Sequence, residues 1–236
     1  MPAKAGQAKK KARASTRRPR GSLSREKIIE AAFDLIEDRG VGELSMPRLA
    51  RHIGVGVTSI YWYFRSKEEL FDALTERAAV MFSELMPTLT GHSWDSHLRH
   101  YFRAFRRIFM ENPALCDLII LRAPMQPQEA TDHYVRRLEA ELNVLMAAGF
   151  PMDQAVHAYM TLSVYARGCV LQNRLYAATR GSHEDHGRSA FVSAIDPGST
   201  PAMAASVDQW STTFATDADF EAGLTTIVNG LTMNMT

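Results

Sequence analysis

Two groups of histidines and acids have the spacing of a metal site: His92, Asp95, His97 and His100, and further along the chain His183, Asp185 and His186. Imidazole and carboxylate groups can bind zinc, but histidine pairs at polar helix ends or in loops are usually solvated. The sequence contains no Gly-rich phosphate loop after a strand, no nucleophile elbow and no Cys-x-x-Cys. We therefore expect no metal site, no cofactor and no catalytic residue.

Residues 46–65, MPRLARHIGVGVTSIYWYFR, carry a stronger signal. A helix-turn-helix requires a small residue where the helices cross, a turn residue that tolerates positive φ, and apolar residues facing inward. Ala50 is the small residue and Gly54 is the turn residue. The inward apolar residues are Leu49, Ile53, Val55 and Ile60. An ordinary helical hairpin is the alternative, and the complete pattern within so short a segment argues against it.

The second helix of this motif is predicted over residues 57–64, and its outward residues are Thr58, Ser59, Tyr61, Trp62 and Tyr63. A helix of this size is about 12 Å long and suits a major groove about 12 Å wide. Its hydroxyl groups can reach base edges and phosphates, and Lys67 can hold a phosphate beside the free N–H groups after Ser66. Packing is the alternative for Tyr61 and Tyr63, and Phe64 is expected in the core.

Helices are predicted throughout the chain to position these residues. The apolar spacing, the serine caps and the Pro and Gly breaks place them at about 24–40, 45–54, 57–64, 66–86, 93–111, 114–122, 128–149, 152–180, 200–213 and 217–234. Residues 181–199 are expected to form a loop. Because no period-2 alternation occurs, the predicted fold class is all-α, with a three-helix N-terminal domain and a larger helical domain.

The charge of the 236-residue chain is unevenly distributed. The formal net charge is +1, yet residues 1–27 hold ten basic residues against Glu26. We predict a disordered basic arm over 1–22, which lies along a polyanion or only aids solubility, then domains over 23–74 and 75–236. The absence of a 20-residue apolar span and of a signal peptide predicts a cytoplasmic protein with no membrane partner. Cys116 and Cys169 are expected to be buried thiols.

Residues 24–74 resemble the DNA-binding domain of the TetR family of transcriptional regulators. The matching segments are IIEAAFDLIEDRG at 28–40, Ser45, LARHIGV at 49–55 and SIYWYFRSKEELFDAL at 59–74. Weaker similarity at 220–231, FEAGLTTIVNGL, resembles the last helix of these proteins. The family resemblance covers about 50 residues strongly.

The resemblance implies phosphate contacts by Ser45, Tyr61 and Lys67 and base contacts from the helix that begins at Val57. Gly56 stands where the family commonly has Ser or Thr, so this helix lacks a side-chain cap acceptor. The full predicted DNA-binding set is Ser45, Arg48, Val57, Thr58, Ser59, Tyr61, Trp62, Tyr63 and Lys67.

Two later helices have apolar stripes that form either the core or a homodimer interface. The stripes are Ala155, Tyr159, Leu162, Ala166 and Val170 in residues 152–180, and Phe220, Leu224, Ile227, Val228 and Leu231 in residues 217–234. The resemblance to the TetR family favours the dimer.

The middle helices are rich in aromatic and methionine residues, which form either a filled core or an adaptable ligand pocket. The predicted ligand-binding set is Phe102, Phe105, Phe109, Leu118, Leu121, Met125, Met146, Phe150, Tyr165, Cys169, Gln172, Asn173 and Tyr176. We therefore predict a homodimeric repressor that a small apolar effector releases from a palindromic double-stranded DNA operator. The alternatives are a non-specific nucleic-acid binder driven by the basic arm, and a helical enzyme or carrier that retains a DNA-binding module.

Overall fold

The computed structural model describes residues 23–121, 128–179, 192–211 and 216–232, and all regular structure in these ranges is helical. The N-terminal elements are α1 (Arg25–Arg39), the 3-10 turn η1 (Val41–Glu43), α2 (Met46–Ile53), α3 (Val57–Tyr61) and α4 (Lys67–Leu85). The C-terminal elements are α5 (Trp94–Glu111), α6 (Pro113–Leu115), the π-helical turn η2 (Cys116–Leu121), α7 (Gln128–Ala147), α8 (Met152–Thr179), α10 (Pro201–Ser211) and α11 (Asp217–Thr232). The predicted basic arm, residues 1–22, lies outside the described residues.

The turn between α2 and α3 has the predicted geometry. Gly54 adopts the left-handed conformation with φ 82° and ψ 34°, which an L side chain rarely adopts. Its N–H donates to the carbonyls of Ala50 and Arg51, so these two carbonyls at the C-terminal end of α2 have a hydrogen-bond partner. Ala50 and Ile60 are buried where the two helices meet. The prediction of a helix-turn-helix is confirmed.

Helix α3 ends earlier than the sequence indicates. It stops at Tyr61, and the N–H groups of Tyr63 and Phe64 both donate to the carbonyl of Ile60 in a final turn. This turn directs the Phe64 side chain into the core, where it has no exposed surface, as predicted. The guanidinium of Arg25 covers the Phe64 ring at 4.4 Å from its centroid.

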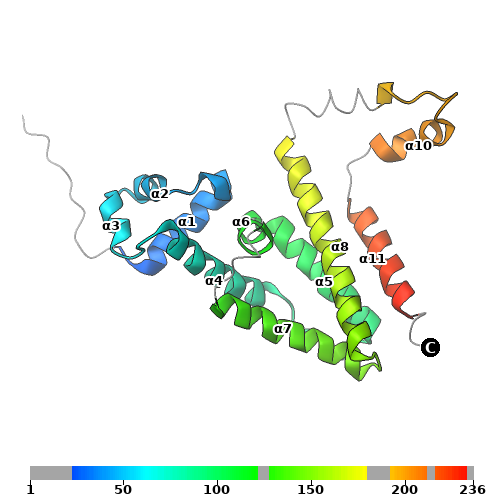
Figure 1. Ribbon diagram of the computed structural model, residues 1–236, viewed down its shortest axis with the longest axis horizontal. Coiled ribbons are helices and arrows are strands. Elements are labelled where there is room, and N and C mark those ends of the chain that lie inside the picture. The colour runs from blue at the N-terminus through cyan, green and yellow to red at the C-terminus, as the bar shows by residue number, and fades with distance from the viewer. Residues whose placement is uncertain (1–22, 122–127, 180–191, 212–215, 233–236) are drawn as a thin grey trace, which may run out of the picture.

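Helix α4 joins the two parts of the molecule. Ser66 caps it by accepting a hydrogen bond from the Glu69 N–H at 3.1 Å, and the helix then continues without a break to Leu85. Figure 1 shows α4 running from the three short helices into the larger helical part. The domain boundary predicted after residue 74 therefore falls within one helix.

The larger part is built on α5, α7 and α8, with α11 beside α5 and α8 (Figure 1). The apolar face predicted for α5 is buried: Leu98, Tyr101, Phe102, Phe105, Ile108 and Phe109. The single helix predicted over 114–122 is instead the short α6 followed by π-helical η2. Cys116 and Cys169 are buried free thiols, as predicted.

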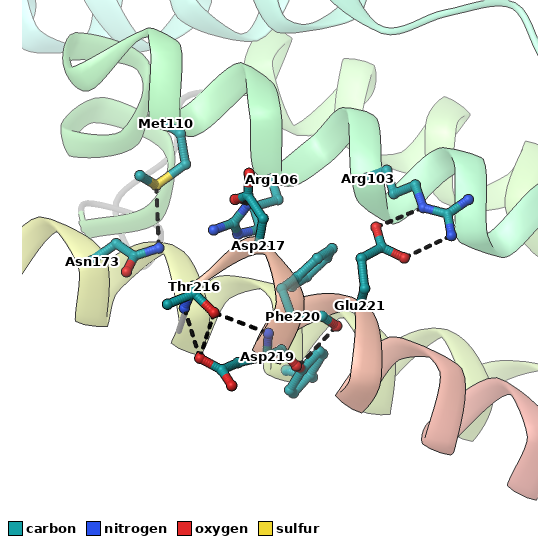
Figure 2. A network of polar contacts seen from close by, with 10 residues as sticks. Arg103, Arg106, Met110, Asn173, Thr216, Asp217, Asp219, Phe220 and Glu221 are labelled. Carbon is teal, nitrogen blue, oxygen red and sulfur yellow. Dashed lines mark hydrogen bonds and ion pairs between the residues drawn. The ribbon is translucent and has the colours of Figure 1, made fainter. Parts of the chain in front are cut away.

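Polar contacts from α5 hold α11 in place. Arg103 forms a two-pronged ion pair with Glu221, with Nε–Oε1 at 2.7 Å and Nη2–Oε2 at 2.6 Å, and Arg106 Nη1 lies 2.6 Å from Asp217 Oδ1 (Figure 2). On the other side, α11 contacts α8 closely at Gly223. A Cβ atom there would lie 2.1 Å from the Tyr165 hydroxyl oxygen, so this approach requires glycine.

Candidate functional site

The outer surface of α3 exposes large side chains. Trp62 is 85% exposed and Tyr61 is 47% exposed. The exposure of Trp62 is unusual, because tryptophan side chains are on average largely buried. Thr58 and Val57 are also exposed, and Ser59 is half-buried. The structure thus brings partly exposed rings and hydroxyl groups together on one surface, which is suited to groove contacts.

Tyr63 differs from the other predicted contact residues of this segment. Its hydroxyl donates to the Leu23 carbonyl at 2.7 Å, and its own carbonyl accepts a hydrogen bond from Arg25 Nη1 at 3.2 Å. The side chain therefore ties the end of the recognition segment to the start of α1. Its geometry is that of a residue that positions Tyr61 and Trp62.

Three predicted DNA-contact residues, Ser45, Arg48 and Lys67, lie at the start or in the first turn of a helix. Ser45 caps α2 by accepting a hydrogen bond from the Arg48 N–H at 3.4 Å, whereas Gly56 caps α3 without a side-chain acceptor. Arg48 is ion-paired with Glu43, and the Lys67 ammonium lies 5.2 Å from the Phe71 ring centroid. Lys67 is the first residue of α4, so its ammonium group is near the free backbone N–H groups of the first turn.

A cavity of about 400 Å³ lies in the larger part of the molecule. Side chains from α4, α5, η2, α7 and α8 line it: Thr75, Ala79, Phe82, Ser83, Tyr101, Phe105, Phe109, Ile119, Ala130, Thr131, His133, Tyr134, Arg137, Tyr159 and Arg167. This volume is within the range of small-molecule sites. The cavity therefore has the size of a ligand site.

One wall of the cavity is aromatic. Phe82 stacks on Phe109 with ring centroids 4.9 Å apart, and Phe105 meets Phe82 and Phe109 edge-on at 5.7 and 4.7 Å. These three rings come from α4 and α5, so the wall joins the helix that starts at the DNA-binding part to the larger core. Such a wall favours a flat apolar ligand.

The polar groups of the cavity are hydroxyls, one imidazole and two guanidiniums, and no carboxylate is among the described lining residues. The Tyr101 and Tyr159 hydroxyls lie 3.5 Å apart, and burial raises the pKa of Tyr159 to about 12 and that of Tyr101 well above its usual value, so both remain neutral phenols. Arg137 and Arg167 add two guanidinium groups, each with a buried Nε that has no hydrogen-bond partner among the described residues.

The predicted ligand residues divide between the cavity and other places. Phe105 and Phe109 line the cavity. Phe102, Leu118, Phe150 and Cys169 are buried, Met146 is half-buried, and Leu121 and Gln172 are exposed. None of these seven residues lines this cavity. Met125 and the Tyr176 side chain lie outside the described residues.

Tyr165 and Asn173 have partners elsewhere. The Tyr165 ring stacks on Phe220, and its hydroxyl donates to the carbonyls of Asp219 and Phe220 at 3.1 Å. Asn173 donates to the Met110 sulfur at 3.8 Å (Figure 2). Both residues therefore hold helices together at the α5–α8–α11 contact.

Sequence reasoning missed the cavity cations because it selected apolar residues for the walls and looked for the polar groups only near the end of α8, at Gln172, Asn173 and Tyr176. A signal was present in α7, where Arg137 and Glu141 fall on the same helix face as the buried Ala130 and Leu145. A charged residue on an apolar stripe marks a polar interior contact.

The buried acid Glu141 has its own partner. Its Oε2 lies 2.8 Å from His97 Nε2, and both side chains are less than a tenth exposed. His92 stacks on His100 at a centroid distance of 4.7 Å. Within the described ranges no group of three metal-binding side chains occurs, and the second histidine group, His183 to His186, lies outside them.

A carboxylate connects the larger part to the helix-turn-helix. Asp117, on η2, accepts the Val41 N–H with Oδ2 at 3.2 Å and Arg174 Nη2 with Oδ1 at 2.6 Å. Val41 belongs to the turn between α1 and α2, and Arg174 belongs to α8. Asp117 is buried, and Ile119 of the same π-helical turn lines the cavity. This bridge therefore joins the cavity wall to the DNA-binding part.

The stripes predicted as possible dimer surfaces face inward. Ala155, Tyr159, Leu162, Ala166 and Val170 are at most 2% exposed. In α11 the same holds for Phe220, Leu224 and Val228, while Ile227 and Leu231 pack partly against the core. Of the two alternatives for these residues, the core is the one that the structure confirms, and the homodimer through residues 152–180 and 217–234 stays a prediction.

The opposite face of α8 is apolar and exposed. Met152, Val156, Met160 and Val164 recur every four residues, and Val164 is 65% exposed. No element among the described residues covers this row, hereafter called the α8 outer stripe. Exposed apolar patches of this kind are typical of interaction surfaces.

The fold and these two sites define the class of a DNA-binding regulator with a helix-turn-helix and an internal cavity. The family model for bacterial regulatory proteins of the tetR family matches residues 28–74, and the model for the tetracyclin repressor-like C-terminal domain matches residues 86–235. The chain belongs to the TetR family of transcriptional regulators. It is a DNA-binding regulator and not an enzyme.

Named relatives support the same assignment. The chain is 37% identical over 214 residues to the HTH-type transcriptional repressor Rv1353c of Mycobacterium tuberculosis, a match covering 90% of this chain and 82% of that protein. It is 31% identical over 204 residues to the tetracycline repressor protein class A from transposon 1721 of Escherichia coli, covering 86% and 88%.

A solved structure has the same fold. The Streptomyces coelicolor TetR family protein ActR in complex with actinorhodin superposes with a TM-score of 0.67 at 23% identity, covering 91% of this chain and 99% of that one. No helix in the part of our chain that the structure describes is long and apolar enough to cross a membrane.

Proposed function

We propose that this protein is a homodimeric repressor that binds a palindromic operator and releases it when a small molecule occupies the cavity. The observation that carries the proposal is that one helix, α4, takes part in both sites. It starts at Lys67 beside the recognition segment and ends among the cavity residues Phe82 and Ser83. Repressor names among the relatives and a ligand complex among the similar structures support it.

DNA docking uses the exposed surface of α3. Thr58, Ser59 and Trp62 enter the major groove, while Ser45, Arg48, Tyr61 and Lys67 face the flanking phosphates. Phosphate contacts fix the register, and the α3 side chains supply sequence discrimination. Tyr63 supports this surface through its hydrogen bond to the Leu23 carbonyl.

Dimerisation uses the α8 outer stripe together with the outer face of α11. The exposed residues of that face include Ala222, Thr226 and Gly230, which are small and recur every four residues. Small residues permit close approach of a partner helix, and the large α8 residues fill the space between helices. Two copies then form an isologous four-helix contact that presents two recognition helices to a palindrome.

Release follows from the two connections between the sites. A ligand against Phe82 shifts the end of α4, and a ligand against Ile119 shifts η2 and with it Asp117. Over its 19 residues α4 is about 28 Å long, so a small tilt at the cavity displaces the recognition segment. By linkage, DNA and ligand each weaken the binding of the other by the same factor.

Footprinting on the DNA upstream of the chain's own gene tests the DNA contacts. Lys67→Ala should weaken binding to all DNA and reduce the salt slope by about one, because one phosphate contact is lost. Thr58→Ala should reduce discrimination between operator and random DNA. Glu68→Ala is the matched control, because Glu68 is an exposed neighbour in the same turn. Absence of a protected palindrome, with binding that disappears when residues 1–22 are deleted, would favour the non-specific alternative.

Light scattering on Val164→Glu tests the interface. Two like charges in a symmetric contact should convert the dimer to monomers and weaken operator binding by at least about tenfold. Gln172→Glu adds the same charge at an exposed site elsewhere on α8 and should leave the dimer intact. A dimer that persists in Val164→Glu would place the interface elsewhere.

A further inference from the structure

The cavity carries a positive charge that no lining acid balances. Arg137 and Arg167 both line it, and no Asp or Glu side chain is among its described lining residues. The nearest buried acid, Glu141, is already paired with His97 at 2.8 Å. A cation in a low-dielectric interior is costly unless an anion joins it.

The hydrogen-bonding capacity of the two guanidiniums is unfilled. Each has a buried Nε–H without a partner among the described residues. The contacts that Arg137 does make are weak, since Nη2 lies 3.4 Å from the Ser83 carbonyl and Cζ lies 5.3 Å from the Phe82 ring centroid. Buried donors are normally satisfied, so these two point to an acceptor supplied from outside the chain.

The two cations act on the same pair of phenols. Arg137 favours the charged form of Tyr101, and Arg167 favours that of Tyr159, in each case against the larger effect of burial, which raises the pKa of both phenols. The buried Glu141 carboxylate, which is paired with His97, opposes this effect at both phenols, so the Tyr101 and Tyr159 hydroxyls are neutral O–H donors beside the two guanidiniums. An anionic oxygen placed there would accept hydrogen bonds from donors on α5, α7 and α8.

We infer that the effector is an aromatic acid, a flat ring system that bears a carboxylate or phenolate. Its rings lie against the Phe82, Phe105 and Phe109 wall, and its anionic oxygen lies toward Arg137 and Arg167. The inference rests on the proposed function and narrows the effector class, because a purely apolar molecule would leave both guanidiniums without an acceptor. Charge-assisted hydrogen bonds would then supply selectivity for the acid over its neutral analogues.

A pair of fluorescent probes tests this inference in the free protein. Anthracene-2-carboxylate and its neutral amide have the same ring system and differ in charge. The intact chain should bind the carboxylate at least about tenfold more tightly than the amide. Arg137→Gln with Arg167→Gln should reduce carboxylate affinity by about 10- to 100-fold and leave amide affinity nearly unchanged.

Arg136→Gln is the matched control, because Arg136 is the exposed neighbour of Arg137 on α7 and its replacement removes the same charge. Its carboxylate affinity should equal that of the intact chain. Equal affinity for the two probes, no binding of the carboxylate, or equal losses in the control and the cavity variants would overturn the inference. Arg137→Lys keeps the charge and serves as a second variant if the double glutamine variant does not fold.

Operator binding without any probe is measured separately. Sequence-specific DNA binding without acid selectivity would overturn the effector class and leave the regulator proposal standing. Acid selectivity without sequence-specific DNA binding would overturn the regulator proposal and leave the effector class standing.

Discussion

The DNA-binding surface and the cavity are built in different ways. The proposed DNA contacts lie within residues 45–67, and the cavity lining extends over residues 75–167 of the chain. In the first region, serine caps and one left-handed glycine set the positions of neighbouring side chains. In the second, helices far apart in the sequence must pack before the site exists. A local site can be damaged without loss of the distant one, whereas the cavity depends on the whole larger part.

The largest expected effect comes from Phe64→Ala, which tests whether the two regions fail separately. Phe64 is fully buried, and removing its ring should cost about 3–5 kcal/mol. The loss should abolish operator binding while anthracene-2-carboxylate still binds the cavity. Chemical denaturation measures the loss of stability, and probe fluorescence measures binding to the cavity. Simultaneous loss of both activities would mean that the regions fold as one unit.

Asp117→Asn comes next and tests the connection between the regions. The buried carboxylate neutralises Arg174 and accepts the Val41 N–H, so its loss should cost about 2–3 kcal/mol. Operator affinity is measured with and without anthracene-2-carboxylate. The probe should lower operator affinity less in this variant than in the intact chain. Asp153→Asn, at an exposed residue in the first turn of α8, is the control. An unchanged probe effect in Asp117→Asn would leave α4 as the only connection.

Ser45→Ala tests the local construction of the DNA-binding surface. The side chain caps α2, and its removal should cost about 1 kcal/mol and weaken operator binding further through a lost phosphate contact. Ser93→Ala is the control, because Ser93 precedes α5 without a side-chain hydrogen bond to the helix backbone. Thermal unfolding compares the two variants, and equal destabilisation would show that the α2 cap contributes nothing.

The smallest expected effect is at the α5–α11 contact. Hydrogen bonding to Arg103 lowers the pKa of Glu221 below its usual 4.5. A lowered folded-state pKa adds stability that is present above pH 4.5 and is lost as the pH falls through the folded value. Because both side chains are about two-fifths exposed, Glu221→Gln should cost only about 0.5 kcal/mol at neutral pH. Thermal melts at neutral and acidic pH should differ between the variant and the intact chain only at neutral pH.

The helix-turn-helix was predictable because its signals are local. Ser45, Gly54 and Ser66 each act within four residues of their own position, through a cap or a turn, and Ala50 meets a helix that begins only seven residues later. The length of α3 was overestimated, since periodicity did not show that Phe64 reaches the core from a turn. The contact partner of Tyr63 was also out of reach, because Leu23 lies forty residues away.

Whether the predicted stripe of α8 forms the core or a dimer interface could not be decided from the sequence, for a physical reason. The helix is apolar on both sides, with Ala155 and Leu162 on one and Met160 and Val164 on the other. The spacing of apolar residues alone does not show which side of such a helix packs against the rest of the same chain. The cavity cations were missed for the related reason that Arg137 and Arg167 look like surface residues until four helices are packed around them.

The exposure of Trp62 gives the protein an optical reporter. An indole that is 85% exposed emits at the long wavelength of a water-exposed tryptophan, whereas Trp94 packs edge-on against Phe150 at 4.9 Å. Replacing Trp94 and Trp210, the other two tryptophans, with phenylalanine would therefore leave Trp62 as the one indole of the chain. Contact of α3 with DNA bases would quench this emission, so association and release can be followed in real time without attaching a dye.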